Sequence, residues 1–284
     1  GQLLVMLILA VFYSVGLALF ALASVACALA IALDRPMTFL DCDVEGANAH
    51  LFLRPAMHSR EEVFVPCPMI DTDRCDACGR CVKECQFGAM IQLGKKVKLM
   101  ANLCHGCGVC RLVCPRAAIT MTGRLVGIMH SGTAGPIRFY CGELRTGEAL
   151  SVPIIRKIKE QRGDLVIIDC PPGTSCPAVE SVEGSDFALL VTEPTPFGEH
   201  DLRGMITVCR RLGVPCGVVI NRSSGDDAII ESLCGAEGVS ILMRIPFDRK
   251  VAEAYAKGGT LLEAMPGIKD QLLDMFLDIE RLCR

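Results

Sequence analysis

Tryptophan is absent from this 284-residue chain, and aromatic residues make up only 5% of it. Proteins that bind single-stranded nucleic acid stack the bases on aromatic side chains, so this scarcity disfavours such a surface. The formal net charge of −3 gives no overall basic footprint for nucleic acid either, although it leaves room for a local basic patch. We therefore expect no specific nucleic-acid partner.

Charge is missing from the first 33 residues, because Asp34 is the first charged residue of the chain. A run this long could span a bilayer, which takes about 20 apolar residues, but it lacks the basic start of a signal peptide. We favour a buried strand over 3–9, a turn, a buried helix over 16–33 and a strand over 37–40, because strands covered on both faces are continuous apolar runs. A membrane anchor over residues 1–33 stays open, since hydropathy alone does not separate the two readings.

Cysteine, in contrast, is abundant, and eight of the 18 cysteines form two runs of the spacing C-x2-C-x2-C-x3-C. The runs are Cys75, Cys78, Cys81, Cys85 and Cys104, Cys107, Cys110, Cys114. An offset of 29 residues places each cysteine of the first run on one of the second, which makes the region an internal repeat. Pro115 completes the bacterial ferredoxin pattern after the second run, where the first run has Gln86.

This spacing predicts two [4Fe–4S] clusters, because the first three cysteines of such a run wrap one cubane and the fourth ligates the other cluster. The first cluster is assigned to Cys75, Cys78, Cys81, Cys114, and the second to Cys104, Cys107, Cys110, Cys85. Zinc sites usually combine two C-x2-C pairs separated by a longer loop, and disulfides suit short secreted chains. Both alternatives are therefore disfavoured. His105, inside the second run, is predicted to be a loop residue and not a ligand.

The ten cysteines outside the runs are scattered, and most lie in apolar stretches that suit small core residues. Buried thiols and cluster thiolates together indicate a reducing compartment. We therefore expect a cytoplasmic protein, with a membrane-anchored protein that faces the cytoplasm as the alternative.

Apolar strands alternate with helices along the rest of the chain, which predicts an α/β fold with a mostly parallel sheet. Strands are expected over 165–168, 188–192, 218–220 and 240–245, and helices over 153–161, 199–212 and 268–282. The stretch 54–68, with three prolines, predicts a domain boundary, and the glycine-rich stretch 123–147 predicts short strands and loops.

Carboxylates follow two of the predicted strands, Asp41 and Asp43 after the strand at 37–40 and Asp169 after the strand at 165–168. The carboxyl ends of parallel strands are where such sheets bind ligands. An aspartate in this position can equally be a helix cap or a turn residue.

Four stretches resemble the MinD/ParA-type P-loop ATPases: DCDVEGAN (41–48), IDCPPGT (168–174), VTEPTPFG (191–198) and IPFD (245–248). The chain is most similar to the branch with an inserted ferredoxin domain, often labelled cobyrinic acid a,c-diamide synthase-like. The resemblance implies a nucleotide-hydrolase domain over residues 1–63 and 123–284, with a two-[4Fe–4S] ferredoxin domain inserted over 64–122.

The resemblance also implies roles at matching positions. Asp43 would orient the attacking water, Asp41 would lie beside it, and Asp169 would hold Mg²⁺ through water. Gly173 would belong to a switch loop that senses the phosphate, and Asn221 would contact adenine. Such positioning and charge neutralisation carry phosphoryl transfer.

One element of that family is missing: residues 8–16 read ILAVFYSVG where the family has a glycine-rich Walker A loop with lysine. A phosphate cradle needs inward-facing N–H groups, which glycines permit, and a cation. Here there is one glycine, and the first lysine of the chain is Lys83. Mg-ATP binding and ATPase activity are therefore in doubt. A degenerate ATPase, a wrongly recorded N-terminus and a membrane anchor all stay open.

These features favour an iron–sulfur ATPase-like protein that couples nucleotide state to two clusters, in electron transfer or metal-cofactor assembly. The alternative is an electron-transfer dicluster ferredoxin on a degenerate scaffold that binds no nucleotide. A partner-positioning ATPase like MinD or ParA is a third hypothesis. The expected partner is a redox protein or a metallocofactor-assembly protein, and a homodimer stays open.

Overall fold

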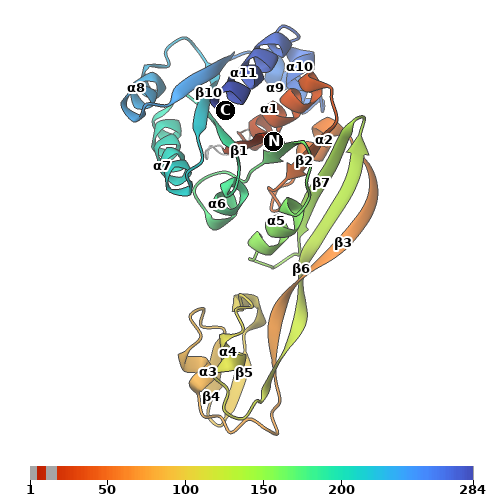
Figure 1. The fold of residues 1–284 in the computed structure, drawn as a ribbon, viewed down its shortest axis with the longest axis vertical. Coiled ribbons are helices and arrows are strands. Elements are labelled where there is room, and N and C mark those ends of the chain that lie inside the picture. The colour runs from red at the N-terminus through yellow and green to blue at the C-terminus, as the bar shows by residue number, and fades with distance from the viewer. Residues whose placement is uncertain (1–4, 11–17, 284) are drawn as a thin grey trace. The chain divides into compact units, whose positions relative to one another are not determined.

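The computed structural model describes residues 5–10 and 18–283. Among these residues, nine strands form one sheet in the order β11-β10-β9-β1-β8-β2-β7-β6-β3 (Figure 1). The strands are β1 (Val5–Ala10), β2 (Met37–Asp41), β3 (Ala56–Ile70), β6 (Ile119–Ala134), β7 (Ile137–Leu144), β8 (Leu165–Asp169), β9 (Phe187–Thr192), β10 (Cys216–Ser223) and β11 (Ser240–Pro246). Every pairing from β11 through to β7 is parallel, as the alternation of strands and helices predicts.

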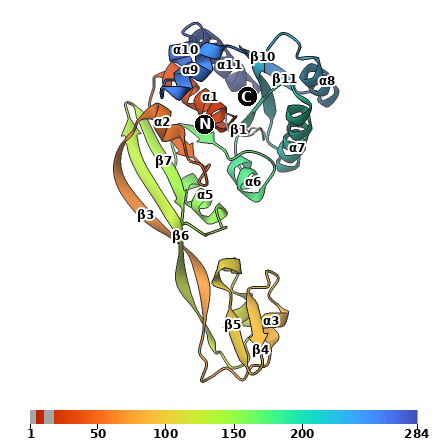
Figure 2. The ribbon, with the colours of Figure 1, turned by 180° about the vertical axis from the view of Figure 1, so that it is seen from behind.

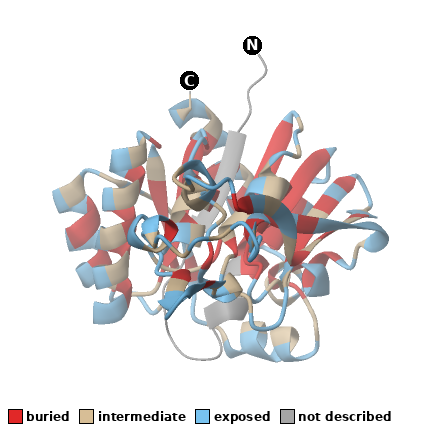
Figure 3. Ribbon diagram, turned by 90° about the horizontal axis from the view of Figure 1, so that it is seen from below, coloured by how far each residue is buried: buried red, intermediate tan, exposed pale blue. Residues whose placement is uncertain are grey.

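The central strands are buried along their whole length, and Figure 3 shows how the buried residues concentrate on the sheet. Phe39 of β2 is the register partner of Phe139 of β7, and their rings stack with centroids 5.9 Å apart. Helices cover both faces of a parallel sheet, so its strands are continuously apolar instead of alternating. This explains why the apolar runs at 37–40, 165–168 and 188–192 predicted strands correctly.

The helices fall into two groups by their contacts. One group contains α1 (Ala18–Leu33), α2 (Ala49–Leu53), α9 (Arg249–Ala256), α10 (Leu261–Ala264) and α11 (Ile268–Leu282), and the other contains α6 (Cys176–Val182), α7 (Pro196–Leu212) and α8 (Ala228–Glu237). Figures 1 and 2 show these groups on opposite sides of the sheet. A further helix, α5 (Val152–Lys159), leads into β8.

The apolar N-terminal segment supplies a strand and a helix to this core. Strand β1 lies between β8 and β9 and pairs with both. Residues 23–30 of α1 are buried throughout, as expected of a helix that is apolar on all sides. Across residues 5–10 and 18–283, no helix is long and apolar enough to cross a membrane. Residues 11–17, which hold most of the expected Walker A position, lie outside the described residues.

Of the two predictions about the chain around the cysteines, only the one for 123–147 is wrong. The stretch 54–68 contains a division between compact units, after Arg60, although most of it is the long strand β3. Pro66 and Pro68 are tolerated in β3 because it is the last strand of the sheet order, where one edge needs no donors. The stretch 123–147 consists mainly of the long strands β6 and β7 and not of short strands and loops. Gly135, with φ of +57°, makes the tight turn between them.

The chain divides into two compact units. One comprises the described residues up to Arg60, together with Met129–Glu143 and the residues from Ile155 on; the other comprises Glu61–Ile128 and Leu144–Ile154. The second unit contains α3 (Arg80–Lys83), α4 (Val109–Leu112) and a hairpin of β4 (Met90–Leu93) and β5 (Lys96–Leu99). Its small core is centred on Cys81, Met90, Val97 and Ile119. We call this second unit the insert.

Candidate cluster and nucleotide sites

Two cavities in the insert collect the eight cysteines of the two runs. The first cavity is lined by Cys75, Cys78, Cys81 and Cys114. The second cavity is lined by Cys85, Cys104, Cys107 and Cys110. Each cavity therefore takes the first three cysteines of one run and the fourth cysteine of the other, which is the distribution that the spacing predicted.

The internal repeat extends to the backbone of the two cysteine loops. Gly79 and Gly108, 29 residues apart, both have φ of +75° and precede α3 and α4. The same offset relates Ala77 to Gly106 and Gly88 to Ala117, and all four of these residues also have positive φ. Left-handed residues turn the chain sharply and direct successive side chains and N–H groups inward. The repeat is thus two copies of one loop conformation that wraps three cysteines around a cavity.

Backbone N–H groups surround the fourth cysteine of each run. The N–H of Ala118 donates to Sγ of Cys114 at 3.3 Å. Burial by itself raises the pKa of the Cys85 thiol. Hydrogen bonds from the backbone N–H groups of residues 87–90 together lower the pKa by more than burial raises it, so the net pKa shift is downward. These donors favour the thiolate form, which is the form that ligates metal.

For two thiols, one in each cavity, the pKa shift is in the opposite direction. Burial raises the pKa of Cys81 and Cys110, and the neighbouring cysteines of the same cavity raise it further. Four thiolates gathered in a partly buried cavity repel one another, so the arrangement calls for a cationic centre between them. An iron–sulfur cluster supplies that positive charge, and its redox chemistry, when it is bound.

The donor chemistry fits this group. All 18 cysteines lie within the described residues and are free thiols. Across the described chain, no three Cys, His, Asp or Glu side chains are arranged to hold a single metal ion. His105 also lines the second cavity, where its ring stacks on Phe87 at 3.9 Å between centroids.

The predicted nucleotide residues begin at the carboxyl edge of the parallel sheet. Asp41 of β2 and Asp169 of β8 are register partners on adjacent strands. The carboxylate of Asp41 is fully buried and accepts the N–H of Asp43 through Oδ1 and the N–H of Ala49 through Oδ2. Both of its oxygens are thus engaged by the backbone, so Asp41 holds the loop from Asp43 to α2 in place.

Asp169 differs from Asp41, because its buried Oδ1 has no hydrogen-bond partner. Burial raises its pKa well above the usual range, and the charges of Asp41 and Asp43 raise it further. Burial and the nearby Glu45 also raise the pKa of Asp43 to about 6. The unpartnered oxygen of Asp169 suits contact with the water shell of a divalent cation such as Mg²⁺, which keeps several of its waters when a protein binds it.

Gly173 lies in the loop between β8 and α6 and has φ of +79°. A Cβ built there would meet nothing within 4 Å, so the left-handed backbone, and not crowding, is what favours glycine at this position. The adjacent Thr174 packs its methyl group towards Gly204 of α7. The expected switch loop therefore follows directly on Asp169 and packs against α7, the second helix after it.

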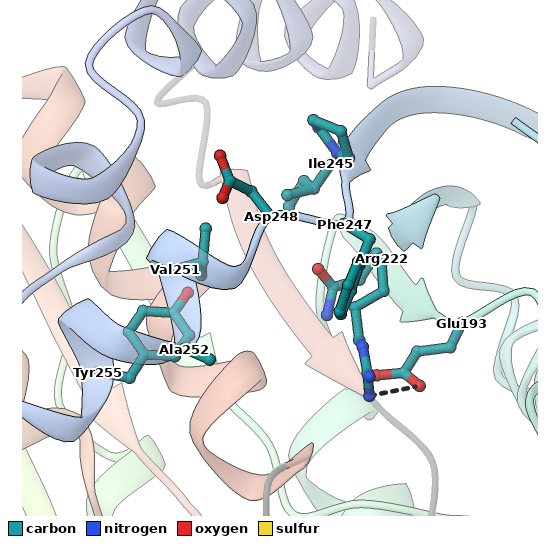
Figure 4. Close-up of a pocket in the computed structure, with 10 residues that line it drawn as sticks. Glu193, Arg222, Ile245, Phe247, Asp248, Val251, Ala252 and Tyr255 are labelled. Atoms are coloured by element: carbon teal, nitrogen blue, oxygen red, sulfur yellow. Dashed lines mark hydrogen bonds and ion pairs between the residues drawn. The ribbon is translucent and has the colours of Figure 1, made fainter. Parts of the chain in front are cut away.

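Asn221, near the end of β10, lines a pocket at the ends of β10 and β11 (Figure 4). In the sheet order, β9 and β1 separate these strands from β8, which carries Asp169. The other lining residues are Glu193, Arg222, Ile245, Pro246, Phe247, Asp248, Val251, Ala252 and Tyr255. Arg222 lies 5.2 Å above the Phe247 ring and 3.5 Å from Glu193. Apolar walls with a few polar groups at one edge suit a flat heterocycle.

Sequence reasoning named only Asn221 in this pocket and missed Glu193, Arg222 and Tyr255. Glu193 and Phe247 lie within two of the stretches that resembled the P-loop ATPases, so the motifs held a signal for them. Nothing in the sequence pointed to Tyr255, whose hydroxyl donates to Ser24 Oγ of α1 at 2.7 Å. That contact joins segments 231 residues apart, so only the folded chain reveals it.

Comparison with known proteins adds to this geometry. Residues 74–119 match the family model of the 4Fe-4S dicluster domain. The chain is 32% identical over 245 residues to the uncharacterized protein MJ0578 of Methanocaldococcus jannaschii, which covers 84% of this chain and 83% of that protein. Over 96 residues it is 33% identical to the cytosolic Fe-S cluster assembly factor NUBP2 homolog of Trichoplax adhaerens, covering 30% of this chain and 36% of that protein.

Solved structures with the same fold are MinD and ParA proteins. The septum site-determining protein MinD of Pyrococcus horikoshii, complexed with Mg-ADP, has a TM-score of 0.59 and 16% identity, and the match covers 98% of this chain and 97% of MinD. A ParA family ATPase of Chlorobium tepidum has a TM-score of 0.55 and 13% identity, with coverage of 96% and 98%. At these identities the likeness is one of fold.

The chain thus combines the fold of the MinD and ParA proteins with a 4Fe-4S dicluster domain. The chain belongs to the same family as MJ0578 of Methanocaldococcus jannaschii.

Proposed function

We propose that this protein couples the binding of Mg-ATP at the carboxyl edge of its parallel sheet to two [4Fe–4S] clusters in the insert. The first cluster is held by Cys75, Cys78, Cys81, Cys114 and the second by Cys104, Cys107, Cys110, Cys85. The observation that carries the proposal is the crossed distribution of the two runs over two cavities. A paired-cubane ferredoxin requires this crossing, and a pair of zinc sites does not.

The nucleotide half of the proposal is supported by Asp169. Its buried, unpartnered Oδ1 suits water-mediated Mg²⁺ binding, and Asp43 beside it suits the positioning of a water near a terminal phosphate. The pocket at Asn221 suits adenine, with the Phe247 ring and the Arg222–Glu193 pair at its edge. The MinD of Pyrococcus horikoshii, which shares the fold, was solved with Mg-ADP.

A covalent path leads from this edge towards the insert. Asp41 binds the N–H of Ala49 at the start of α2, and α2 runs directly into β3. Nη2 of Arg54, between α2 and β3, donates to the carbonyl of Gly258 at 2.8 Å. A change at Asp43 on nucleotide binding would therefore reach the first residues of β3 through a short, hydrogen-bonded segment. Ordering of such a segment by phosphate contacts is a common nucleotide switch.

The likeness to the cluster assembly factor NUBP2 homolog favours metal-cofactor assembly as the biological setting, whereas the ferredoxin-type pairing of two clusters favours electron transfer. We propose electron delivery to a partner redox or assembly protein. An electron carrier retains its clusters, and four cysteines line each cavity, which is a full set of protein ligands for one retained [4Fe–4S] cluster. A homodimer joined through the nucleotide domains belongs to the same proposal.

The second candidate function is a dicluster ferredoxin on a scaffold that no longer binds nucleotide. The observation that favours it is the sequence ILAVFYSVG at residues 8–16, which lacks the glycines and the lysine of a phosphate cradle. The two candidates share the clusters and differ only in the nucleotide site.

Anaerobic purification with iron and sulfide analysis, EPR after reduction and Mg-ADP titration of the same sample test both. The first function predicts about eight irons per chain, interacting S = 1/2 signals and saturable Mg-ADP binding. Full iron content without nucleotide binding would select the second function. Colourless protein that carries zinc would overturn both.

A further inference from the structure

The insert carries a charge opposite to that of the rest of the chain. The insert contains ten Lys and Arg and seven Asp and Glu, a formal charge of +3, whereas the whole chain carries −3. Its cysteine-bearing part, residues 74–119, contains eight Lys and Arg but only two Asp and Glu, a formal charge of +6. Cluster thiolates offset part of this charge, but they lie in the cavities and the basic side chains lie outside them. Arg80, Lys83, Lys95, Lys96, Lys98, Arg111 and Arg116 are all exposed.

Almost all of these cations lack an anionic neighbour. Arg116 pairs with Asp76 at 2.8 Å. For the lysines at 95, 96 and 98, no carboxylate of the described chain lies within ion-pair distance. Exposed cations that the protein itself does not neutralise create a positive field that steers anionic partners.

Three of the cations lie on the β4–β5 hairpin. The register of the two strands shows which side chains lie on each of its two faces. Lys96 is opposite Leu93 and Lys98 is opposite Ile91, so these four side chains share one face. Lys95 lies in the connecting turn. Leu93 is 56% exposed, so the face has an apolar centre beside its cations. We call this the outer face of the hairpin.

The inner face of the hairpin covers the cysteine cavities. Val97 lines the first cavity, and Met90 and Leu99 line the second. Gln92 Nε2 donates to the carbonyl of Ala77 in the first cysteine loop at 3.0 Å. One layer of β-hairpin is therefore all that separates the cationic outer face from both cavities.

We propose that the outer face of the β4–β5 hairpin docks a small acidic electron-transfer protein. One electron then passes between the partner's reduced centre and a cluster behind the hairpin, with no bond made or broken. The inference rests on redox-active clusters in the insert, as proposed above, and is independent of nucleotide.

The structure favours an acidic protein over nucleic acid as the occupant. Binding of single strands needs aromatic platforms, and the outer face has none, since its members are aliphatic or cationic. The one aromatic residue within 74–119, Phe87, is stacked on His105 at the second cavity. A cationic rim around an apolar centre instead matches a transient interface in which charge sets the encounter rate.

The test is stopped-flow electron transfer from a reduced, acidic two-[4Fe–4S] ferredoxin to the oxidised holoprotein at increasing ionic strength. We expect the second-order rate constant to fall with salt, and the double variant Lys96→Glu/Lys98→Glu to react about tenfold more slowly at low salt. At high salt, wild type and variant should converge because screening removes the steering. The control Arg211→Glu/Lys269→Glu changes the same charge at exposed sites outside the insert and should behave like wild type.

Iron content, EPR spectra and midpoint potentials of each variant separate the other outcomes. One such outcome is a rate constant that is independent of salt and equal in wild type and both variants, while the clusters are intact and dithionite reduces them. That result overturns the docking inference alone. A shift in potential without a change in the salt dependence would assign the lysines to tuning the clusters and overturns it too. Tight, salt-dependent binding of a single-stranded RNA 20-mer, lost in the hairpin variant while the ferredoxin rate is kept, likewise overturns it. Protein without iron would end both this inference and the proposed function.

Discussion

Single residues at the sheet edge show how position divides roles among chemically identical side chains. Asp41 and Asp169 are register partners, yet backbone N–H groups engage both oxygens of Asp41 and leave Oδ1 of Asp169 unpartnered. A buried carboxylate without a partner is costly, so a protein retains one where something binds it. The asymmetry leaves an oxygen of Asp169 free to meet a ligand, whereas Asp41 holds the loop that follows it.

Replacement of Asp169 by Asn should therefore act in opposite directions on stability and on binding. Removal of the buried charge should raise the free energy of unfolding of the metal-free protein, by about 1 kcal/mol or more. Affinity for Mg-ADP should fall at least tenfold, about 1.4 kcal/mol. Urea unfolding in EDTA and calorimetric titration measure the two effects. Asp164→Asn, at an exposed position nearby in the chain, should change neither.

The pH dependence of stability follows from the raised pKa of Asp43, from its usual 3.8 to about 6 in the folded chain. Between these values the folded protein binds the proton more tightly than the unfolded chain does. The stabilisation is complete below about pH 4 and is lost as the pH rises through 6. Stability of the metal-free protein should thus decline from about pH 4 to about pH 6, and Asp43→Asn should flatten the curve there by up to about 1.4 kcal/mol per pH unit. An unchanged slope in the variant would mean that Asp43 keeps an ordinary pKa.

At the scale of elements, the two cysteine loops act as one unit because the last cysteine of each loop lines the cavity of the other. The fourth cysteines, Cys85 and Cys114, follow directly on α3 and α4, and these two short helices contact each other. Loss of either loop would therefore damage both cavities.

The crossed ligation predicts which variants share a spectrum. Cys114→Ser should perturb the same EPR signal as Cys75→Ser, although the two cysteines belong to different runs. Cys85→Ser should match Cys104→Ser in the same way. The comparison needs reduced samples of all four variants with iron analysis. If Cys114→Ser instead matched Cys104→Ser, each run would bind its own cluster and the assignment would be wrong.

Helix α7 offers a test of local packing. Thr195 caps its first turn by accepting the N–H of Gly198 at 3.0 Å, and a Cβ on Gly198 would lie 2.3 Å from the carbonyl oxygen of Glu193. Gly198→Ala should therefore lower the free energy of unfolding by about 2 kcal/mol or more. Gly235→Ala is the matched control, because a Cβ at this site in α8 meets nothing within 4 Å and should stabilise the protein by up to about 1 kcal/mol. Urea titrations of the two variants give the comparison.

At the scale of the whole molecule, the question is whether the nucleotide edge and the clusters communicate. The chain that leaves Asp43 reaches β3 through α2 alone, and β3 runs on towards the cysteines. Coupling between two sites is reciprocal, so a nucleotide that changes cluster potential must itself bind differently to oxidised and reduced protein.

A redox titration with and without Mg-ATP measures this coupling. A fivefold preference of the nucleotide for one redox state corresponds to a shift of about 40 mV in a one-electron midpoint potential. We expect a shift of this order in wild type and none in Asp169→Asn. Saturable nucleotide binding with no shift in potential would show that the two sites work independently.

The sequence by itself determined the fold class and the presence of an iron–sulfur domain. The cysteine spacing is a local property, and a loop that wraps three thiolates needs only residues that are close in the sequence. The ligands of the two clusters could therefore be predicted from the amino-acid sequence alone. Continuous apolar runs likewise predicted buried parallel strands, because burial on both faces removes alternation. The prediction failed at 123–147, where glycines, which often form turns, lie in the long strands β6 and β7.

Only the tertiary structure decided which of several similar groups does what. Register and burial separate Asp169 from Asp41, and the Tyr255–Ser24 contact joins distant segments. The hairpin's division into a cationic face and a cluster-facing face likewise depends on strand pairing. Such distinctions depend on distances between residues remote in the chain and on the removal of water around them. Sequence order records neither, because both arise only when the chain packs.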